Sequence, residues 1–106
     1  MEFELLDEED GLSSHNVIDI ALDSIGFYWI STSDGLNRYD GNSFKVFKHD
    51  PDDTTTVLEN NTNTLYVDFK GRIWLGYQKG GMSYFDKACH CFKHFKPNDS
   101  DLKVLN

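Results

Sequence analysis

Short apolar runs alternate with turns rich in glycine, aspartate and asparagine along most of the chain. Asp-Gly and Gly-Asn between such runs favour β-hairpins, because glycine and asparagine tolerate a positive φ. The pattern predicts eight strands, at residues 17–22, 27–32, 36–39, 43–48, 64–67, 72–76, 82–85 and 91–95. No segment has a sustained helical period, so the sequence predicts an all-β fold.

The two halves of the chain repeat one another. Asp23, Gly26 and Trp29 recur 45 residues later, and after a one-residue insertion Tyr39 recurs as Phe85. A repeat of this length is typical of propellers and other arrays of one supersecondary unit. We assign eight residues to the structural core of the repeat: Asp23, Gly26, Trp29, Tyr39, Asp68, Gly71, Trp74 and Phe85.

Strand patterning favours propeller blades. Residues 17–22 and 27–30 are almost continuously apolar, which predicts inner strands covered on both faces. The lysines of residues 44–48 instead predict an exposed outer edge. Repeated four-stranded units with these properties describe blades of a β-propeller. A two-sheet sandwich is the structural alternative, but it does not require a repeated unit.

The blade pattern also predicts how the chain is divided. We expect an orphan outer strand and lead-in at 1–11, a first blade at 12–50, a linker at 51–56, a second blade at 57–96 and a truncated linker to a third blade at 97–106. Two blades cannot close a ring, which generally takes four to eight. We therefore expect a fragment of a larger propeller, which self-associates through exposed blade faces or strand edges.

Composition excludes several classes of partner. The formal net charge is −8, with 18 acidic and 10 basic residues, so the chain lacks the basic surface that nucleic acids require. No apolar run approaches the roughly 18 residues of a membrane span, so no membrane insertion is expected in this segment.

Two clusters contain residue types that bind metals. Cys89, His90 and Cys91 lie close to His94, but a strand at 91–95 would point Cys91 and His94 to opposite faces. We favour ordinary surface residues over a metal site or a redox pair. The acidic segment 50–53 begins like a calcium loop, yet it lacks the required glycine and the final glutamate, so we interpret it as a solvated linker. We predict no catalytic residues, no metal site and no cofactor.

Trp29 and Trp74 have two interpretations. Exposed tryptophans stack on sugars, but these two lie within apolar strands, which favours packing between blades.

Three segments resemble the two-component regulator propeller repeat. They are Leu12-Ser13-Ser14-His15-Asn16-Val17, the Asp23-x-x-Gly26-x-x-Trp29-Ile30 pattern, and Asp34-Gly35-Leu36-Asn37-Arg38-Tyr39-Asp40-Gly41. The resemblance implies the periplasmic, ligand-sensing region of a hybrid two-component histidine kinase embedded in the inner membrane. It further implies an oligosaccharide as the class of ligand, and that an orphan strand completes the last blade of the ring. The ligand-binding residues stay unknown.

Two other functions remain open. The blades could belong to a structural or protein-interaction scaffold, or to a propeller enzyme such as a lyase. An enzyme needs convergent acids at the central channel, and this segment has none that the pattern identifies. A fold by itself does not decide between these functions.

Overall fold

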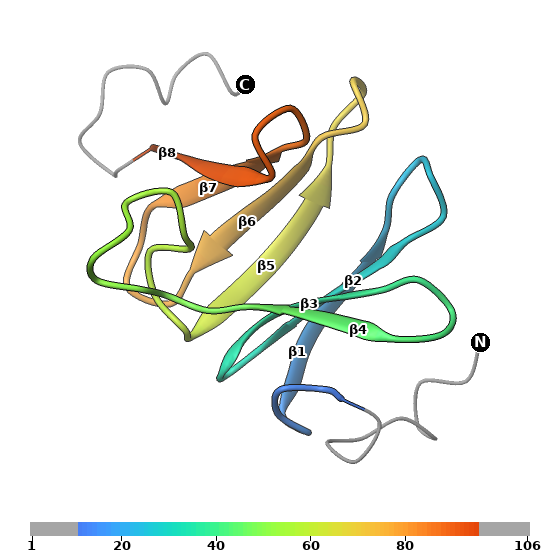
Figure 1. Ribbon diagram of the computed structural model, residues 1–106, viewed down its shortest axis with the longest axis horizontal. Helices are drawn as coiled ribbons and strands as arrows, with labels where there is room; N and C mark the ends of the chain where they lie inside the picture. The colour runs from blue at the N-terminus through green and yellow to red at the C-terminus, as the bar shows by residue number, and fades with distance from the viewer. Residues whose placement is uncertain (1–10, 96–106) are drawn as a thin grey trace.

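The computed structural model describes residues 11–95, which form two four-stranded antiparallel sheets (Figure 1). In each sheet the strands are neighbours in chain order, as a meander. The first sheet contains β1 (Val17–Leu22), β2 (Tyr28–Thr32), β3 (Gly35–Tyr39) and β4 (Phe44–Phe47). The second contains β5 (Thr62–Val67), β6 (Ile73–Tyr77), β7 (Met82–Asp86) and β8 (Cys91–Phe95).

The all-β prediction is confirmed. Both ends of each predicted strand at 17–95 lie within two residues of the ends of an observed strand. The predicted orphan strand and the predicted linker at 97–106 lie outside the described residues. No helix among residues 11–95 is long and apolar enough to cross a membrane.

The repeat seen in the sequence is also a repeat of strand register. Ile30 pairs with Ile20 on one side and Asn37 on the other, and Leu75 pairs in the same way with Leu65 and Ser83. The first ladder of each sheet contains an irregularity near its start. The two units therefore share a backbone plan as well as a residue pattern.

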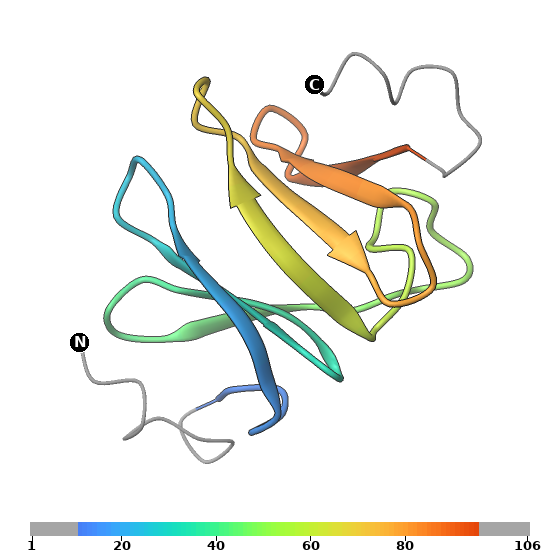
Figure 2. The ribbon, with the colours of Figure 1, turned by 180° about the vertical axis from the view of Figure 1, so that it is seen from behind.

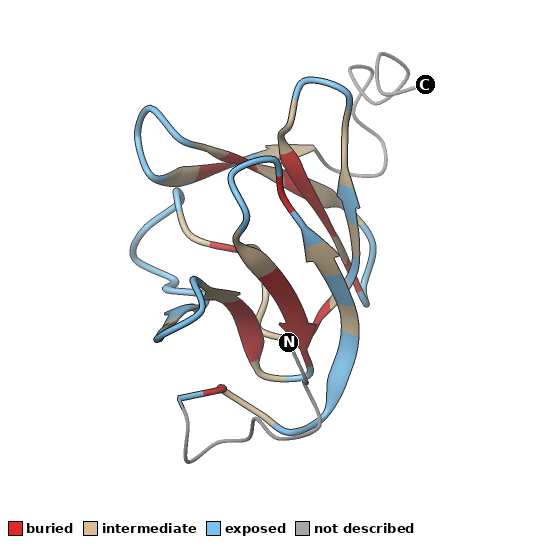
Figure 3. Ribbon diagram, turned by 90° about the vertical axis from the view of Figure 1, so that its right-hand side faces the viewer, coloured by how far each residue is buried: buried red, intermediate tan, exposed pale blue. Residues whose placement is uncertain are grey.

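The hydrophobic core lies between the two sheets. β1 and β2 of the first sheet lie against β5 of the second, as the view from behind shows (Figure 2). Side chains from both sheets and from the segment between β4 and β5 fill this space: Trp29, Leu36, Val57, Ile73, Leu75, Tyr77, Phe85 and Phe92. Buried residues accordingly concentrate on the inner strands, whereas the turns are exposed (Figure 3).

The expectation that residues 17–22 are covered on both faces is wrong. Val17 is 41% exposed and Leu22 is 53% exposed, because β1 is an edge strand with a neighbouring sheet on one side only. β2 fits the expectation, since every residue after Tyr28 is buried. The prediction for the fourth strand is confirmed: β4 forms the other edge of its sheet, and Lys45 is exposed.

Candidate functional site

A carboxylate organises the turn between β1 and β2. Asp23 Oδ1 accepts hydrogen bonds from the backbone N–H groups of Ile25, Gly26 and Phe27, at 2.9 to 3.0 Å. Its Oδ2 accepts a hydrogen bond from the Trp29 indole at 2.8 Å. Burial disfavours the charged form, but these hydrogen bonds outweigh that effect and lower the pKa of Asp23.

The turn between β5 and β6 repeats this arrangement with one additional cation. Asp68 Oδ1 accepts from the backbone N–H groups of Lys70 and Arg72, and Oδ2 accepts from the Trp74 indole and from Arg72 Nε, both at 2.8 Å. Burial again opposes ionisation. The hydrogen bonds from Trp74, Arg72 and Lys70 prevail and lower the pKa of Asp68 to about 2.

The two turns contact each other. Gly71 has φ +81°, and a Cβ at this position would lie 2.9 Å from Ser24 Oγ in the first turn. Glycine is therefore favoured at position 71 by its left-handed backbone, and a Cβ there would also force the Ser24 side chain to rotate away. Gly26 has φ +104° but open space around it, so only its backbone conformation requires glycine.

The two tryptophans of the repeat have different neighbours. Trp29 is 1% exposed and packs against Phe47 of its own sheet and Phe85 of the other, with ring centroids 5.7 and 5.2 Å away. Trp74 is also buried, but its ring contacts are Tyr84 and Phe95 of its own sheet. Tyr39, the repeat equivalent of Phe85, is half-buried and packs on Phe44. Packing between units is thus observed for Trp29.

A guanidinium group lies among the aromatic rings at the junction of the sheets. The Cζ atom of Arg38 lies 5.0 Å from the ring centroid of Phe27 and 5.9 Å from that of Phe85. The ring centroids of Trp29 and Phe47 lie at intermediate distances from it. Such contacts are attractive because the face of each ring is electron-rich. Sequence patterning did not reveal this role, because the register of β3 must be known before Arg38 can be placed on the otherwise apolar face.

Two hydrogen-bonded side chains also join the sheets, and neither was predicted. Asp19 Oδ2 accepts a hydrogen bond from Leu65 N at 2.9 Å. Thr62, which is fully buried, donates from Oγ1 to the carbonyl oxygen of Thr32 and accepts from its N–H, at 2.8 and 3.0 Å. The only signal in the sequence was that each is a polar residue within a strand.

Two shallow hollows flank the turn between β5 and β6. One, of about 390 Å³, lies between residues 22–24 and 67–71. The other, of about 330 Å³, lies between residues 70–72 and 84–88. Both include Lys70 and Gly71, and beside them Phe69 is 93% exposed with the Lys70 ammonium 5.9 Å from its ring centroid. The surface around this turn therefore combines an exposed aromatic ring, a cation and two hollows.

A buried serine and a half-buried histidine take part in a structural chain of hydrogen bonds. His94 Nε2 lies 2.9 Å from the carbonyl oxygen of Thr54, and its Nδ1 lies 2.7 Å from Ser83 Oγ. The carbonyl requires a hydrogen on Nε2, so in the neutral imidazole Nδ1 accepts from Ser83. The Tyr77 hydroxyl then donates to Ser83 at 2.8 Å and accepts from the N–H of Leu58. Ser83 is completely buried, so these hydrogen bonds hold the segment between β4 and β5 against the second sheet, and Ser83 does not present a nucleophile.

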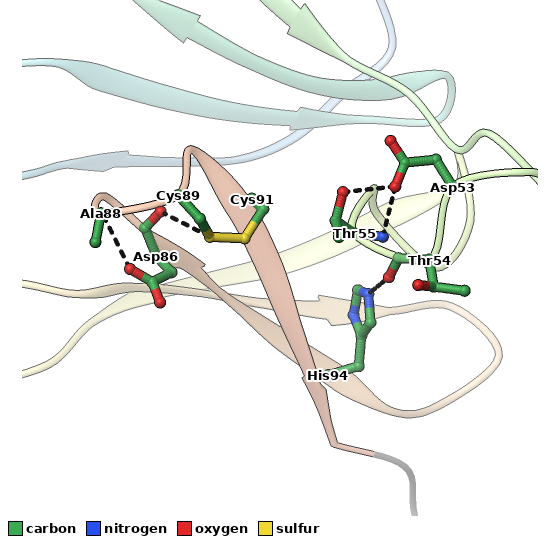
Figure 4. Close-up of a disulfide and its surroundings, with 8 residues drawn as sticks. All are labelled: Asp53, Thr54, Thr55, Asp86, Ala88, Cys89, Cys91 and His94. Atoms are coloured by element: carbon green, nitrogen blue, oxygen red, sulfur yellow. Dashed lines mark hydrogen bonds between the residues drawn. A yellow bond between two sulfur atoms is a disulfide. The ribbon is translucent and has the colours of Figure 1, made fainter.

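The two cysteines are joined by a disulfide, which corrects the prediction of ordinary surface residues (Figure 4). Their Cα atoms lie 5.2 Å apart across the turn between β7 and β8, within the range that a disulfide allows. The prediction failed because the turn bends the chain back, which brings two residues separated by one position to the same side. The predicted orientation of His94 is confirmed, since it pairs with Ser83 while Cys91 pairs with Asp86, on opposite faces.

The acidic segment at 50–53 is a tight turn. Asp50 and Asp53 form an isolated bridge, and Asp53 Oδ1 accepts hydrogen bonds from the N–H and the hydroxyl of Thr55, which lower its pKa. Within residues 11–95, no three histidine, cysteine or acidic side chains are grouped so that they could hold a metal ion.

Comparison with known proteins confirms the resemblance found in the sequence. Residues 11–34 match the family model of the two component regulator propeller. A histidine kinase, P4, of Formosa agariphila is 50% identical over 48 residues, which are 45% of this chain and 4% of that protein. The chain thus spans a small part of this relative.

Solved structures show the same fold. The extracellular domain of a hybrid two component system from B. thetaiotaomicron is 26% identical, with a TM-score of 0.61, over 76% of this chain and 11% of that one. A second such domain from the same organism is 21% identical, with a TM-score of 0.51, over 86% of this chain and 20% of that one. The two sheets are therefore propeller-type blades, and the chain is related to the sensor domains of hybrid two-component systems.

Proposed function

We propose that this chain forms part of the extracytoplasmic, ligand-sensing propeller of a hybrid two-component sensor histidine kinase. The observation that carries the proposal is the joint likeness to a histidine kinase and to the extracellular domain of a hybrid two-component system, over blades with the same fold. The disulfide between Cys89 and Cys91 supports a periplasmic location, because disulfides persist in oxidising compartments.

We further propose that the ligand is an oligosaccharide and that it contacts the turn between β5 and β6. Loops at the end of a rigid β scaffold are the usual place for ligand contacts. Here the exposed ring of Phe69 offers a surface on which a sugar ring stacks, and Lys70 offers hydrogen-bond donors to hydroxyl groups. The adjoining hollows give such a ligand space beside this surface.

Titration calorimetry with size-fractionated oligosaccharides from plant and algal polysaccharides tests the ligand class. We expect heat of binding with at least one fraction, and a loss of at least about tenfold in affinity in Phe69→Ala, which corresponds to roughly 1.4 kcal/mol. Ile25 is an exposed apolar residue on the turn between β1 and β2, so Ile25→Ala is the matched control and keeps its affinity. Binding that is unchanged in Phe69→Ala contradicts the placement of the site.

The complete reading frame of the gene tests the sensory role separately. Sensing requires that the coding sequence continue into a membrane helix and a kinase core. A frame with neither would favour a scaffold. Release of unsaturated sugars from an acidic polysaccharide by the purified protein would favour a lyase.

A further inference from the structure

We propose that the Cys89–Cys91 bridge is a thiol–disulfide exchange site for soluble dithiols, and not a cross-link that the fold requires. The proposal goes beyond ligand sensing and does not depend on it. It follows from the position of the bridge in the hairpin, from its exposure, and from its link to the packing between the sheets.

The hairpin is closed without the bridge. β7 and β8 pair at five positions, from Met82 with Phe95 to Asp86 with Cys91. The repeat supplies an internal comparison, because the hairpin of β3 and β4 closes through Asp40, Gly41 and Asn42 with no cysteine. A bridge between residues this close in sequence also removes little entropy from the unfolded chain. The disulfide therefore adds little to the stability of the fold.

The bridge is accessible to a thiolate. Cys89 is exposed and Cys91 is half-buried, so an incoming thiolate reaches the sulfur of Cys89 more easily. Lys87 and Lys93 each lie two residues from one of the cysteines in the sequence, and both are exposed on this otherwise acidic protein. The carboxylate of Asp86 is the nearby opposing charge, and its Oδ1 accepts a hydrogen bond from the N–H of Ala88. Neighbouring cations favour both an approaching thiolate and a leaving one.

The residue between the cysteines links the bridge to the core. His90, with φ 54°, is the only non-glycine residue with a positive φ in the described part of the chain. Its ring lies edge-on to that of Phe85, with centroids 6.0 Å apart, and Phe85 is buried between the sheets against Trp29 and Phe47. Opening the bridge frees His90 to leave the left-handed region, which changes a direct contact of the core.

The reduced form also has a hydrogen-bond partner in place. Cys89 Sγ lies 3.7 Å from the carbonyl oxygen of Asp86 (Figure 4). A disulfide sulfur carries no hydrogen, so in the oxidised protein this is a contact only. After reduction the Cys89 thiol donates to this oxygen without movement of the strand.

The exchange proceeds in two steps. One thiolate of the dithiol attacks Cys89 Sγ, forms a mixed disulfide, and releases Cys91 as a thiolate that takes up a proton. The second thiolate of the reagent then attacks the reagent's other sulfur, which is bonded to Cys89 in the mixed disulfide. This step closes the reagent's own disulfide and releases the Cys89 thiolate, which is protonated in turn. Two electrons pass from the dithiol to the protein, which gains two thiols.

Incubation with dithiothreitol, followed by alkylation and mass spectrometry, tests the proposal on the folded chain. We expect complete reduction of Cys89 and Cys91 by millimolar reagent without denaturant. The far-UV circular dichroism should be unchanged and the melting temperature should fall by only a few degrees. In Trp74→Phe, which leaves Trp29 as the remaining tryptophan, the fluorescence should change on reduction, whereas Cys89→Ser/Cys91→Ser should be insensitive to the reagent. Cys91→Ser alone should form a stable mixed disulfide with oxidised glutathione.

Three results would overturn the proposal. Reduction that occurs only in denaturant would show that the bridge is inaccessible. Loss of the folded state in Cys89→Ser/Cys91→Ser would make the bridge a required cross-link. Fluorescence that is identical in both redox states would remove the link to the core. None of these results bears on oligosaccharide binding at Phe69, so the two proposals fail separately.

Discussion

At the scale of single residues, the Asp-x-x-Gly-x-x-Trp pattern is a hydrogen-bonding unit. The carboxylate satisfies the N–H groups that the tight turn leaves without strand partners, and its second oxygen holds the indole of a buried tryptophan. Glycine supplies the positive φ at the turn. Each residue type is thus set by a particular bond or backbone angle, which explains why all three recur together.

The pKa of Asp68 predicts acid sensitivity. Its folded value is about 2, below its ordinary value of 3.8, so the ionised form is stabilised by folding. The contribution is fully present above about pH 4 and is lost progressively as the pH falls toward about 2. Urea denaturation across this range should show that the wild type loses more free energy of unfolding than Asp68→Asn. The pKa values of Asp23, Asp40 and Asp53 are also lowered, but these residues titrate in both proteins. If the free energy of unfolding fell with pH in the same way in both proteins, the lowered pKa of Asp68 would be contradicted.

Trp29 should be one of the most costly residues to truncate. It is 1% exposed and contacts aromatic rings of both sheets, so Trp29→Ala leaves a cavity at their junction. We expect the free energy of unfolding to fall by roughly 3–5 kcal/mol, measured by chemical denaturation. Trp29→Phe is the matched control and should lose less, because it keeps an aromatic ring. An emission maximum typical of an exposed indole in folded Trp74→Phe, in which Trp29 is the remaining tryptophan, would contradict the burial of Trp29.

At the scale of elements, the sequence was sufficient for features that are local. Alternation of apolar runs with turns rich in glycine, aspartate and asparagine located the strands of residues 11–95, and the recurrence of Asp23, Gly26 and Trp29 revealed the repeated unit. Features that depend on the third dimension were missed. The exposure of β1 depends on how many sheets lie beside it, and the bonds of Asp19 and Thr62 depend on which strands meet. The disulfide depends on the path of one turn. Features of this kind can be identified only from the packed structure.

The junction of the two sheets should depend on Thr62. In Thr62→Val the N–H of Thr32 loses its buried acceptor at nearly constant side-chain volume. We expect a loss of about 1–3 kcal/mol in the free energy of unfolding, since a buried donor is left unsatisfied. Thr64→Val, at an exposed position of the same strand, is the matched control and should be nearly neutral. Equal stability of the two variants in urea denaturation would exclude a role for this bond.

At the scale of the whole molecule, the two outer faces are repeats of the two faces that already pack together. Tyr66, Trp74, Tyr84 and Phe95 occupy the positions that Ala21, Trp29, Arg38 and Phe47 occupy in the first sheet. At the other end, Ile20 and Leu22 of the first sheet correspond to Leu65 and Val67 of the second. The outer face of the second sheet in one copy is therefore suited to pack on the outer face of the first sheet in another copy, as the two inner faces pack within one chain.

We propose on this basis that copies of the chain associate head to tail, sheet on sheet. Tyr66 is 65% exposed and Leu22 is 53% exposed, so part of each face is open to such a contact, although Ser13 covers Asn37 on the face of the first sheet. Sedimentation velocity should show a mean mass that rises with concentration, because the contact joins two different faces and leaves one of each free at the ends. Leu22→Lys and Tyr66→Lys act on opposite faces and should each abolish the rise, since a charge would be buried without a partner. Ile25→Lys, on the turn beyond the sheet, is the control and should associate as the wild type does. A folded monomer of the wild type at high micromolar concentration would refute the association.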